Sequence, residues 1–238
     1  MIDNLDSRNI YQATTMLLSG RPTKPVDVLF FHGRLFGDDT GLFELAADLV
    51  KNKMVGIVAL FGNEGERVGS NIPFEANPGK TWYRKQLIEY GVPPDQIIFA
   101  AEGGYHTELE SDGFLTLAAE KGWLSGAILT QPHQLLRATL GMVRAMQQQW
   151  YVMNVYTVTP PTTNWNEIVF GSQGMEAKPR VDHIVDELVR VAKYQQDGGL
   201  VSFTELFAYL EKRDRNELVL GPTERGSQLF TRGLPSGI

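Results

Sequence analysis

The strongest constraint on the fold is an alternation of two apolar patterns through residues 26–160. Short apolar runs of strand length are separated by longer stretches in which apolar residues recur at helical spacing. The runs expected to be strands are 26–31, 56–61, 96–100, 127–129 and 151–158. The helical patterns between them cover 42–51, 81–90, 111–121 and 132–149. Such an alternation is typical of parallel strands joined by crossover helices.

The expected strands are apolar almost throughout and do not alternate with polar residues. Residues 28–31, for example, contain no polar side chain. A continuous apolar run fits a strand that is covered on both faces, as in a parallel sheet. The sequence therefore predicts an α/β fold of the Rossmann-like, doubly wound type, with a mainly parallel five-stranded sheet and helices on both faces. The order of the strands does not follow from this pattern.

The chain divides into four predicted segments, which are 1–24 (N-terminal helix and linker), 25–160 (Rossmann-like core), 161–220 (helical annex) and 221–238 (tail). The N-terminal helix is expected at 4–18. In the annex, one amphipathic helix follows Pro179, and Ser202 and Glu205 form a capping-box pattern that opens another. The tail is rich in Gly, Pro, Ser and Thr, and we expect either a disordered tail or a strap over the domain.

Composition excludes several classes of protein. The net charge of −6 argues against a general nucleic-acid or anionic-membrane surface, because phosphate groups favour basic faces. The absence of cysteine excludes disulfides, thiolate metal sites and a cysteine nucleophile. No signal peptide and no apolar stretch of about 18 residues is visible, so we expect a cytoplasmic protein.

Three of the four histidines follow the ends of predicted strands. His32 comes after the first strand, His106 after the third and His133 after the fourth. Because ligands bind at the carboxyl ends of the strands in an open parallel sheet, these side chains are expected at one edge. Each histidine alone is also typical of an ordinary loop or helix-start residue. His183 falls on the annex helix, where we expect it to be structural or exposed.

Residues 126–138 combine a strand, a turn and a helix start. Pro132 suits the first turn of a helix, where its missing amide proton costs no hydrogen bond. His133 and Arg137 are four residues apart and share one face of this helix, whose N-terminus adds partial positive charge. We therefore predict that Arg137 binds a negatively charged group of a ligand. His133 is predicted to act as an acid or base, with His106 as a second candidate.

The other strand-end loops supply the remaining candidates for ligand contacts. Glycines after the first two strands allow the backbone to approach an anionic or nucleotide-like ligand closely. Glu102 and Glu110, after the third strand, are expected to bind ribose or amino groups. The predicted ligand-binding residues are His32, Gly33, Arg34, Gly62, Asn63, Glu102, Thr107, Glu110, Thr130 and Arg137.

Several well-known active-site motifs are absent from the sequence. It contains no G-x-G-x-x-G, no G-x-x-x-x-G-K-[ST], no G-x-S-x-G and no H-E-x-x-H. The usual dinucleotide, P-loop and serine-hydrolase sites are therefore not expected. His32, His106 and His133, with Glu102 or Glu110, could still converge on Zn²⁺ or Mn²⁺. A metal site is an alternative that the sequence leaves open.

The order and spacing of several short motifs resemble the domain-of-unknown-function 218 family, the YdcF/SanA-like proteins. The matching pieces within residues 25–160 are 26–33, 57–62, Glu75-Ala76, Gly91-Val92-Pro93, 96–102, 107–111, and His133 with Arg137-Ala138. The chain is most similar to the soluble, YdcF-like branch, because no membrane anchor is visible.

Three of these motifs depart from the family pattern. Phe61-Gly62-Asn63 replaces the family's S-G-G, residues 107–111 replace its T-x-E-N, and three residues separate His133 from Arg137 where the family has two. These departures concern ligand contacts and not the fold.

The resemblance implies a site on the strand-end loops and a nucleotide-like ligand, with S-adenosylmethionine among the candidates. Our first hypothesis is accordingly a small-molecule-binding protein or transferase-like enzyme. A metal-assisted hydrolase of a small phosphate-type substrate is one alternative. The other is a non-enzymatic scaffold or regulatory protein, in which the annex helix forms the dimer face of a homo-oligomer.

Overall fold

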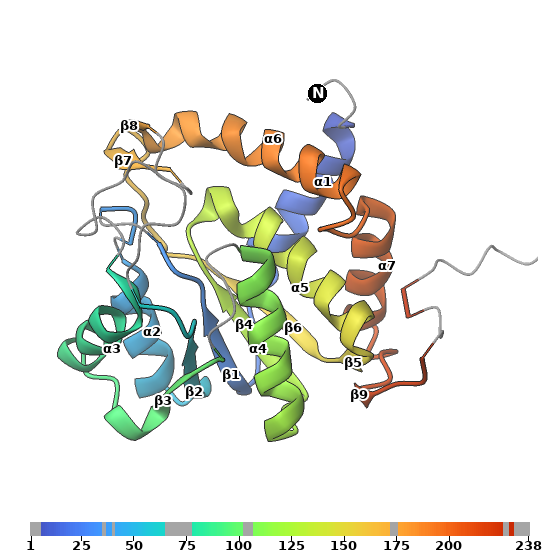
Figure 1. Ribbon diagram of the computed structural model, residues 1–238, viewed down its shortest axis with the longest axis horizontal. Coiled ribbons are helices and arrows are strands. Elements are labelled where there is room, and N and C mark those ends of the chain that lie inside the picture. Colours follow the sequence, from blue (N-terminus) through green and yellow to red (C-terminus); the bar gives the residue numbers. More distant parts are fainter. Residues whose placement is uncertain are drawn as a thin grey trace, which may run out of the picture.

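The computed structural model describes residues 6–34, 37–39, 41–64, 78–101, 107–171, 176–225 and 229–230. At its centre is a parallel sheet of five strands (Figure 1). The strands are β1 (Val26–Phe31), β2 (Val55–Leu60), β3 (Ile97–Phe99), β4 (Ser125–Leu129) and β6 (Asn154–Val158). Their order is β3-β2-β1-β4-β6. The predicted α/β, doubly wound architecture is confirmed, and the structure adds the strand order.

The middle strand shows why an unbroken apolar run forms this sheet. The last four residues of β1 are fully buried. Phe30 lies opposite Ala59 of β2 and Ile128 of β4. Its ring also requires a glycine beside it, because a Cβ atom on Gly126 would lie 2.7 Å from Phe30 Cε2. A strand with neighbours on both edges and helices on both faces has no position that favours a polar side chain.

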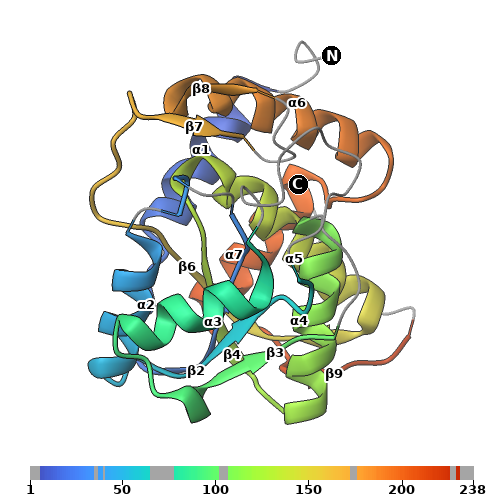
Figure 2. The same cartoon turned by 60° about the vertical axis from the view of Figure 1, so that its left-hand side comes forward.

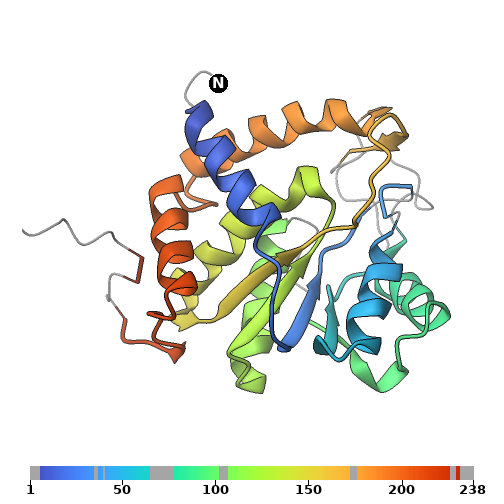
Figure 3. The same cartoon turned by 180° about the vertical axis from the view of Figure 1, so that it is seen from behind.

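Four helices connect the strands of the sheet. They are α2 (Leu42–Lys51), α3 (Gly79–Glu89), α4 (Thr107–Lys121) and α5 (Leu135–Gln149). α2 packs against α3, and α4 packs against α5 on the opposite face (Figures 1 and 3). Short 3₁₀ turns precede two elements, η3 (Pro94–Gln96) before β3 and η4 (Pro132–Gln134) before α5. The turn η4 places the residues that follow β4 at the carboxyl edge of the sheet.

The predicted annex is helical, but it also contains a hairpin that the sequence did not predict. Its elements are β7 (Ile168–Phe170), β8 (Ala177–Pro179), η5 (Arg180–Asp182), α6 (His183–Gln196) and α7 (Phe203–Asp214). The N-terminal helix α1 (Ser7–Leu18) lies beside α5 and α7. α6 crosses over η4 and the ends of α1 and α5 (Figure 2). The capping box of Ser202 and Glu205 is present at the start of α7, as predicted.

The fifth predicted strand, residues 151–158, is divided in the structure. β5 (Tyr151–Val152) pairs antiparallel with β9 (Gly221–Pro222), and only β6 joins the central sheet. Met153 separates the two strands, and its carbonyl accepts a hydrogen bond of 2.9 Å from the Tyr209 hydroxyl. The apolar pattern runs through both strands, so it does not reveal that the chain changes partner at this residue.

The outer edge of β6 is covered by α7 and by the segment before β1. The Tyr209 hydroxyl accepts the Val155 amide at 2.8 Å, and Arg213 donates to the Val155 carbonyl at 2.8 Å. Further along the strand, the Thr157 amide donates to the Gly20 carbonyl at 3.1 Å. Side chains and a neighbouring segment thus occupy hydrogen-bonding groups that an edge strand would otherwise expose.

The segment after residue 220 contacts the domain at its described positions. Besides the β9 pairing, Phe230 is buried, and its ring centroid lies 5.1 Å from that of Tyr209. Residues 226–228 and 231–238, which include Leu234, lie outside the described residues. Within the part of the chain that the structure describes, no helix is long and apolar enough to cross a membrane.

Candidate functional site

The strand order places a topological switch point between β1 and β4. These strands are neighbours, but the chain leaves β1 toward β2 and β3 and leaves β4 toward β6. In open α/β sheets the crevice at such a point is the usual place for a ligand, outside the carboxyl ends of the strands. Two groups of predicted site residues meet here, namely residues 32–34 after β1 and residues 130–134 after β4.

His32, directly after β1, forms a buried pair with Glu110 on α4. The Nδ1 atom of His32 lies 2.9 Å from Glu110 Oε2, and the imidazole is fully buried. The ring packs edge-on against Phe114, with 5.2 Å between ring centroids. The other ring nitrogen, Nε2, is buried without a hydrogen-bond partner among the described residues. His32 therefore has one nitrogen fixed by a carboxylate and one still available.

The predicted glycine and polar residues beside His32 are close-packed against the protein itself. A Cβ atom on Gly33 would lie 2.7 Å from Phe61 Cε1 and 3.1 Å from Glu110 Oε1. Gly62 and Asn63 are buried after β2, and the Asn63 carbonyl accepts the Lys80 amide at 2.9 Å. A glycine at 33 is thus required by the approach of Phe61 and Glu110, independently of any ligand.

Arg34 joins the two strand ends. Its guanidinium donates to Asp38, with 2.6 Å between Nε and Oδ2, and it also donates to Gln134 after β4. Gln134 in turn accepts the Thr130 hydroxyl at 2.6 Å. Burial lowers the pKa of Arg34 to about 10, so the group remains a cation at neutral pH. The Tyr83 hydroxyl, on α3, contacts the Arg34 backbone.

The annex contributes a second guanidinium to this cluster. Arg180, in η5, is almost fully buried and donates from Nε to Asp38 Oδ1 at 3.0 Å. It also donates to the Gly37 carbonyl at 3.0 Å and to Glu167 at 2.9 Å. Asp38 therefore lies between two arginines. Sequence reasoning missed Arg180, because nothing in a Pro-Arg dipeptide 142 residues away indicates that it contacts Asp38.

Arg137 lies on the predicted face of α5, but its guanidinium is already paired. It donates to Glu187 of α6 at 2.5 Å and 3.1 Å and to the Thr107 hydroxyl at 2.6 Å. Arg190 adds a second cation 2.9 Å from Glu187. Burial alone would raise the pKa of Glu187, but Arg137 and Arg190 outweigh it and lower the pKa to about 2. The predicted anion-binding role of Arg137 therefore competes with a carboxylate of the chain itself.

His133 lies in η4, with a guanidinium on one side of its ring. Its Nε2 atom is 3.1 Å from the Arg34 guanidinium and 3.6 Å from Asp38 Oδ2. Burial and the positive charge of Arg34 lower the pKa of His133 to about 2, so the ring is neutral near pH 7. A guanidinium only donates, so Nε2 is the acceptor and the ring proton is on Nδ1. Nδ1 is buried and has no hydrogen-bond partner in the described part of the chain.

Of the other two histidines, the structure describes His183 but not His106. His183 is buried, with Nε2 2.9 Å from the Val169 carbonyl and Nδ1 3.2 Å from Asp186, so it is structural and not exposed. His106 and Glu102 lie outside the described residues. Among the residues that are described, no group of three histidine, aspartate or glutamate side chains could hold a metal ion.

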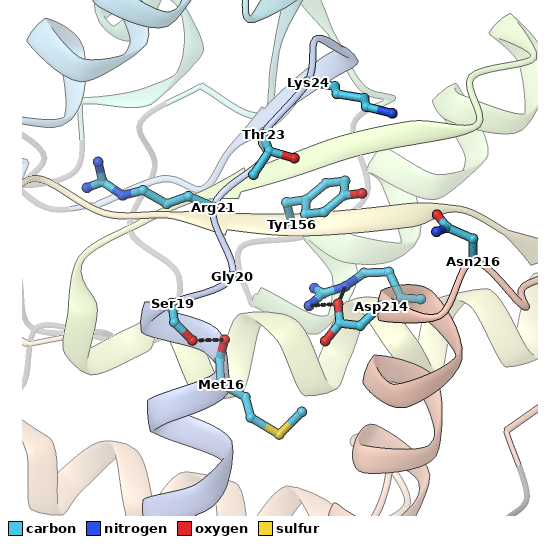
Figure 4. Close-up of a pocket in the computed structure, with 10 residues that line it drawn as sticks. Met16, Ser19, Gly20, Arg21, Thr23, Lys24, Tyr156, Asp214 and Asn216 are labelled. Carbon is cyan, nitrogen blue, oxygen red and sulfur yellow. Dashed lines mark hydrogen bonds and ion pairs between the residues drawn. The ribbon is translucent and has the colours of Figure 1, made fainter.

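A second depression, of about 380 Å³, lies at the outer edge of β6 (Figure 4). No sequence pattern pointed to it. It is lined in part by Lys24, Tyr156 and Arg213, but Arg213 is committed to the Val155 carbonyl and to Asp214. The guanidinium also lies 5.2 Å from the centroid of the Tyr156 ring. Because the Arg213 guanidinium is already paired within the protein, this depression is a weaker candidate than the switch point.

Comparison with known proteins does not add a relative. No protein-family model, no curated protein and no solved structure matches this chain.

Proposed function

We propose that the protein binds a nucleotide-like small molecule at the carboxyl ends of β1 and β4. The observation that carries this proposal is the state of His32, whose Nδ1 atom is held by Glu110 while Nε2 has no partner among the described residues. The strand order supports it, because the switch point of an open parallel sheet is where ligands of this class bind. The resemblance to YdcF/SanA-like proteins adds S-adenosylmethionine as a candidate ligand.

The pair of His32 and Glu110 suits proton transfer or recognition of a hydroxyl group. When Nδ1–H donates to the carboxylate, the lone pair on Nε2 is free to accept a proton from a bound ribose hydroxyl or substrate. Glu110 is then a positioning residue, because it fixes the tautomer and orientation of the ring. Such a geometry fits a transferase-like enzyme as well as a binding protein.

In this proposal the other predicted residues have different roles. His133 is neutral and accepts from Arg34 at Nε2, so it helps to hold that guanidinium and does not act as a base. Arg137 holds α5 to α6 through Glu187. Glu102 remains a predicted ligand contact and His106 a predicted acid or base, and both lie outside the described residues.

The experiment is mass spectrometry of small molecules retained by the purified protein, followed by thermal-shift titration with S-adenosylmethionine and ATP. We expect at least one ligand to raise the melting temperature, and His32→Ala to weaken its binding about tenfold, the equivalent of one hydrogen bond. Glu110→Gln, which keeps an acceptor for Nδ1–H, should weaken binding less.

The matched control is His183→Ala, which removes another buried histidine, one whose ring nitrogens face Val169 and Asp186 and not the pair of His32 and Glu110. Each variant is compared with and without ligand, so that a change in stability alone does not count as lost binding. Equal affinities of His32→Ala and His183→Ala would overturn the assignment of His32. The absence of any stabilising nucleotide or retained molecule would overturn the ligand class.

One observation favours a second candidate, an interaction protein that self-associates. Ile168, Val181 and Val185, close to the start of α6, are exposed to 62%, 41% and 54%. Exposed apolar side chains that lie together often mark protein contacts. A dimer through this surface predicts twice the monomer mass in light scattering and a return to monomer in Val185→Lys. A monomeric wild type would contradict it.

A further inference from the structure

A separate cleft opens between three helices on the annex side of His133. It lies between α1, the start of α5 and α6, and has a volume of about 230 Å³. α6 crosses the ends of the other two helices in every view (Figures 1 to 3). Most of the cleft wall is apolar, and it includes Ile10, Leu17, Leu136, Trp165, Ile184 and Leu188. The proposed nucleotide site does not use these residues.

Two uncharged polar side chains in the described part of the chain line the cleft, those of Thr14 and His133, and His133 is the buried one. His133 lines the cleft, and its side chain is fully buried. Arg34 is bound to Nε2, whereas Nδ1–H has no partner among the described residues. A buried donor without an acceptor costs free energy, so a ligand that supplies an acceptor gains more than an apolar one. Nδ1–H is therefore the recognition group that the cleft offers.

The charges around the cleft argue for an uncharged ligand. Among the described residues that line it, the charged side chains are Arg137 and Glu187, which pair with each other at 2.5 Å. Since each already compensates the other, an ionised ligand would lose its hydration without gaining a free counter-ion. An apolar wall with few polar groups is also the usual composition of a small-molecule site.

We propose that this cleft binds a small, uncharged aromatic or apolar molecule that carries one hydrogen-bond acceptor, such as a carbonyl oxygen. His133 Nδ1–H donates to that acceptor, and the side chains of α1 and α6 enclose the apolar part. An apolar cavity of about 150 Å³ accommodates benzene, so the larger volume here fits a substituted ring. This site is independent of the proposed nucleotide site.

Three probes of similar size test the proposal. Acetophenone has a ring and a carbonyl acceptor, ethylbenzene lacks the acceptor, and benzoate adds a negative charge. In titrations of the full chain followed by NMR, we expect acetophenone to bind at least fivefold more tightly than ethylbenzene, and benzoate to bind most weakly. Equal affinities of acetophenone and ethylbenzene would overturn the role of Nδ1–H, and tighter binding of benzoate would overturn the uncharged class.

Two variants test the location. Ile184→Trp places a larger side chain in the cleft from a partly exposed position, so the fold should tolerate it, and acetophenone binding should be lost. His133→Phe keeps a ring but removes the donor. This variant should bind acetophenone and ethylbenzene with about equal affinity. Unchanged acetophenone binding in Ile184→Trp would overturn the assignment to this cleft, even if His133→Phe fails to fold.

The same titration separates this site from the proposed nucleotide site. His32→Ala should leave acetophenone affinity unchanged, because His32 does not line the cleft. A loss of acetophenone binding in His32→Ala would contradict two independent sites. If no nucleotide binds, the expected order of affinities of the three probes for the cleft stays the same.

Discussion

Two histidines end neighbouring strands of the sheet, and both side chains are fully buried, but their partners carry opposite charge. His32 after β1 lies against the carboxylate of Glu110, whereas His133 after β4 lies against the guanidinium of Arg34. A carboxylate favours a proton on the facing nitrogen, and a guanidinium requires a lone pair there. The same residue type is thus prepared as an acceptor directly after β1 and as a neutral donor in the turn after β4.

The largest effect is expected from breaking the arginine network around His133. Asp38→Asn removes the charge that compensates both Arg34 and Arg180 in a buried setting. We expect a loss of about 3–5 kcal/mol in the free energy of unfolding, because buried Arg34 loses its carboxylate partner and, among the described residues, buried Arg180 keeps only Glu167 as a carboxylate partner. Urea unfolding measures it. Asp48→Asn, on the exposed side of α2, is the control and should change stability by less than about 0.5 kcal/mol.

The pH dependence of stability tests the neutral state of His133. The pKa of about 2 in the folded protein lies below the ordinary value of 6.5, so the unfolded chain binds a proton first as the pH falls. Stability should therefore decrease on acidification, by about 2 kcal/mol from this residue between pH 7 and pH 5. His133→Phe should flatten the decrease by that amount. Identical pH profiles of variant and wild type would show that His133 has the same pKa in the folded protein as in the unfolded chain, which would contradict the neutral buried ring.

The smallest effect is expected at the His32 pair. Glu110→Gln keeps a hydrogen-bond acceptor for Nδ1 and removes only the charge, so the free energy of unfolding should fall by about 1 kcal/mol. Glu108 lies in the same helix and pairs with Arg144 at 3.3 Å near the surface. Glu108→Gln should therefore lower the free energy of unfolding by less than about 0.5 kcal/mol. Chemical denaturation of both variants compares the two pairs. A larger loss for Glu108→Gln would reverse the ranking.

The sequence predicted elements best where local pattern decides them. β1 and α2 have the predicted bounds, because an apolar run followed by His32-Gly33 and a regular helical pattern are local signals. The division of the fifth strand was not predictable in the same way. It depends on Tyr209, 56 residues beyond Met153, whose hydroxyl reaches the backbone between the two strands.

The candidate site was predictable in its residues but not in its pairings. His32 and Glu110 were both predicted, and they meet across 78 residues of sequence because β1 ends and α4 begins at the same edge. The partners of His133 and Arg137 differ from those expected. Glu187, the partner of Arg137, and Arg180, which shares Asp38 with Arg34, come from the annex, whose position over the sheet no local pattern specifies. Arg34 and Arg137, which were expected to meet a ligand, meet Asp38 and Glu187 instead.

The covering of the β6 edge has a consequence for how the chain behaves in solution. A parallel sheet that ends in an open strand can continue into another molecule, because backbone groups pair with any strand of suitable length. Here Tyr209 and Arg213 of α7 occupy groups of Val155 that such a strand would need. α7 therefore blocks extension of the sheet at β6, so the annex covers this edge as well as supplying the partners of the buried charges.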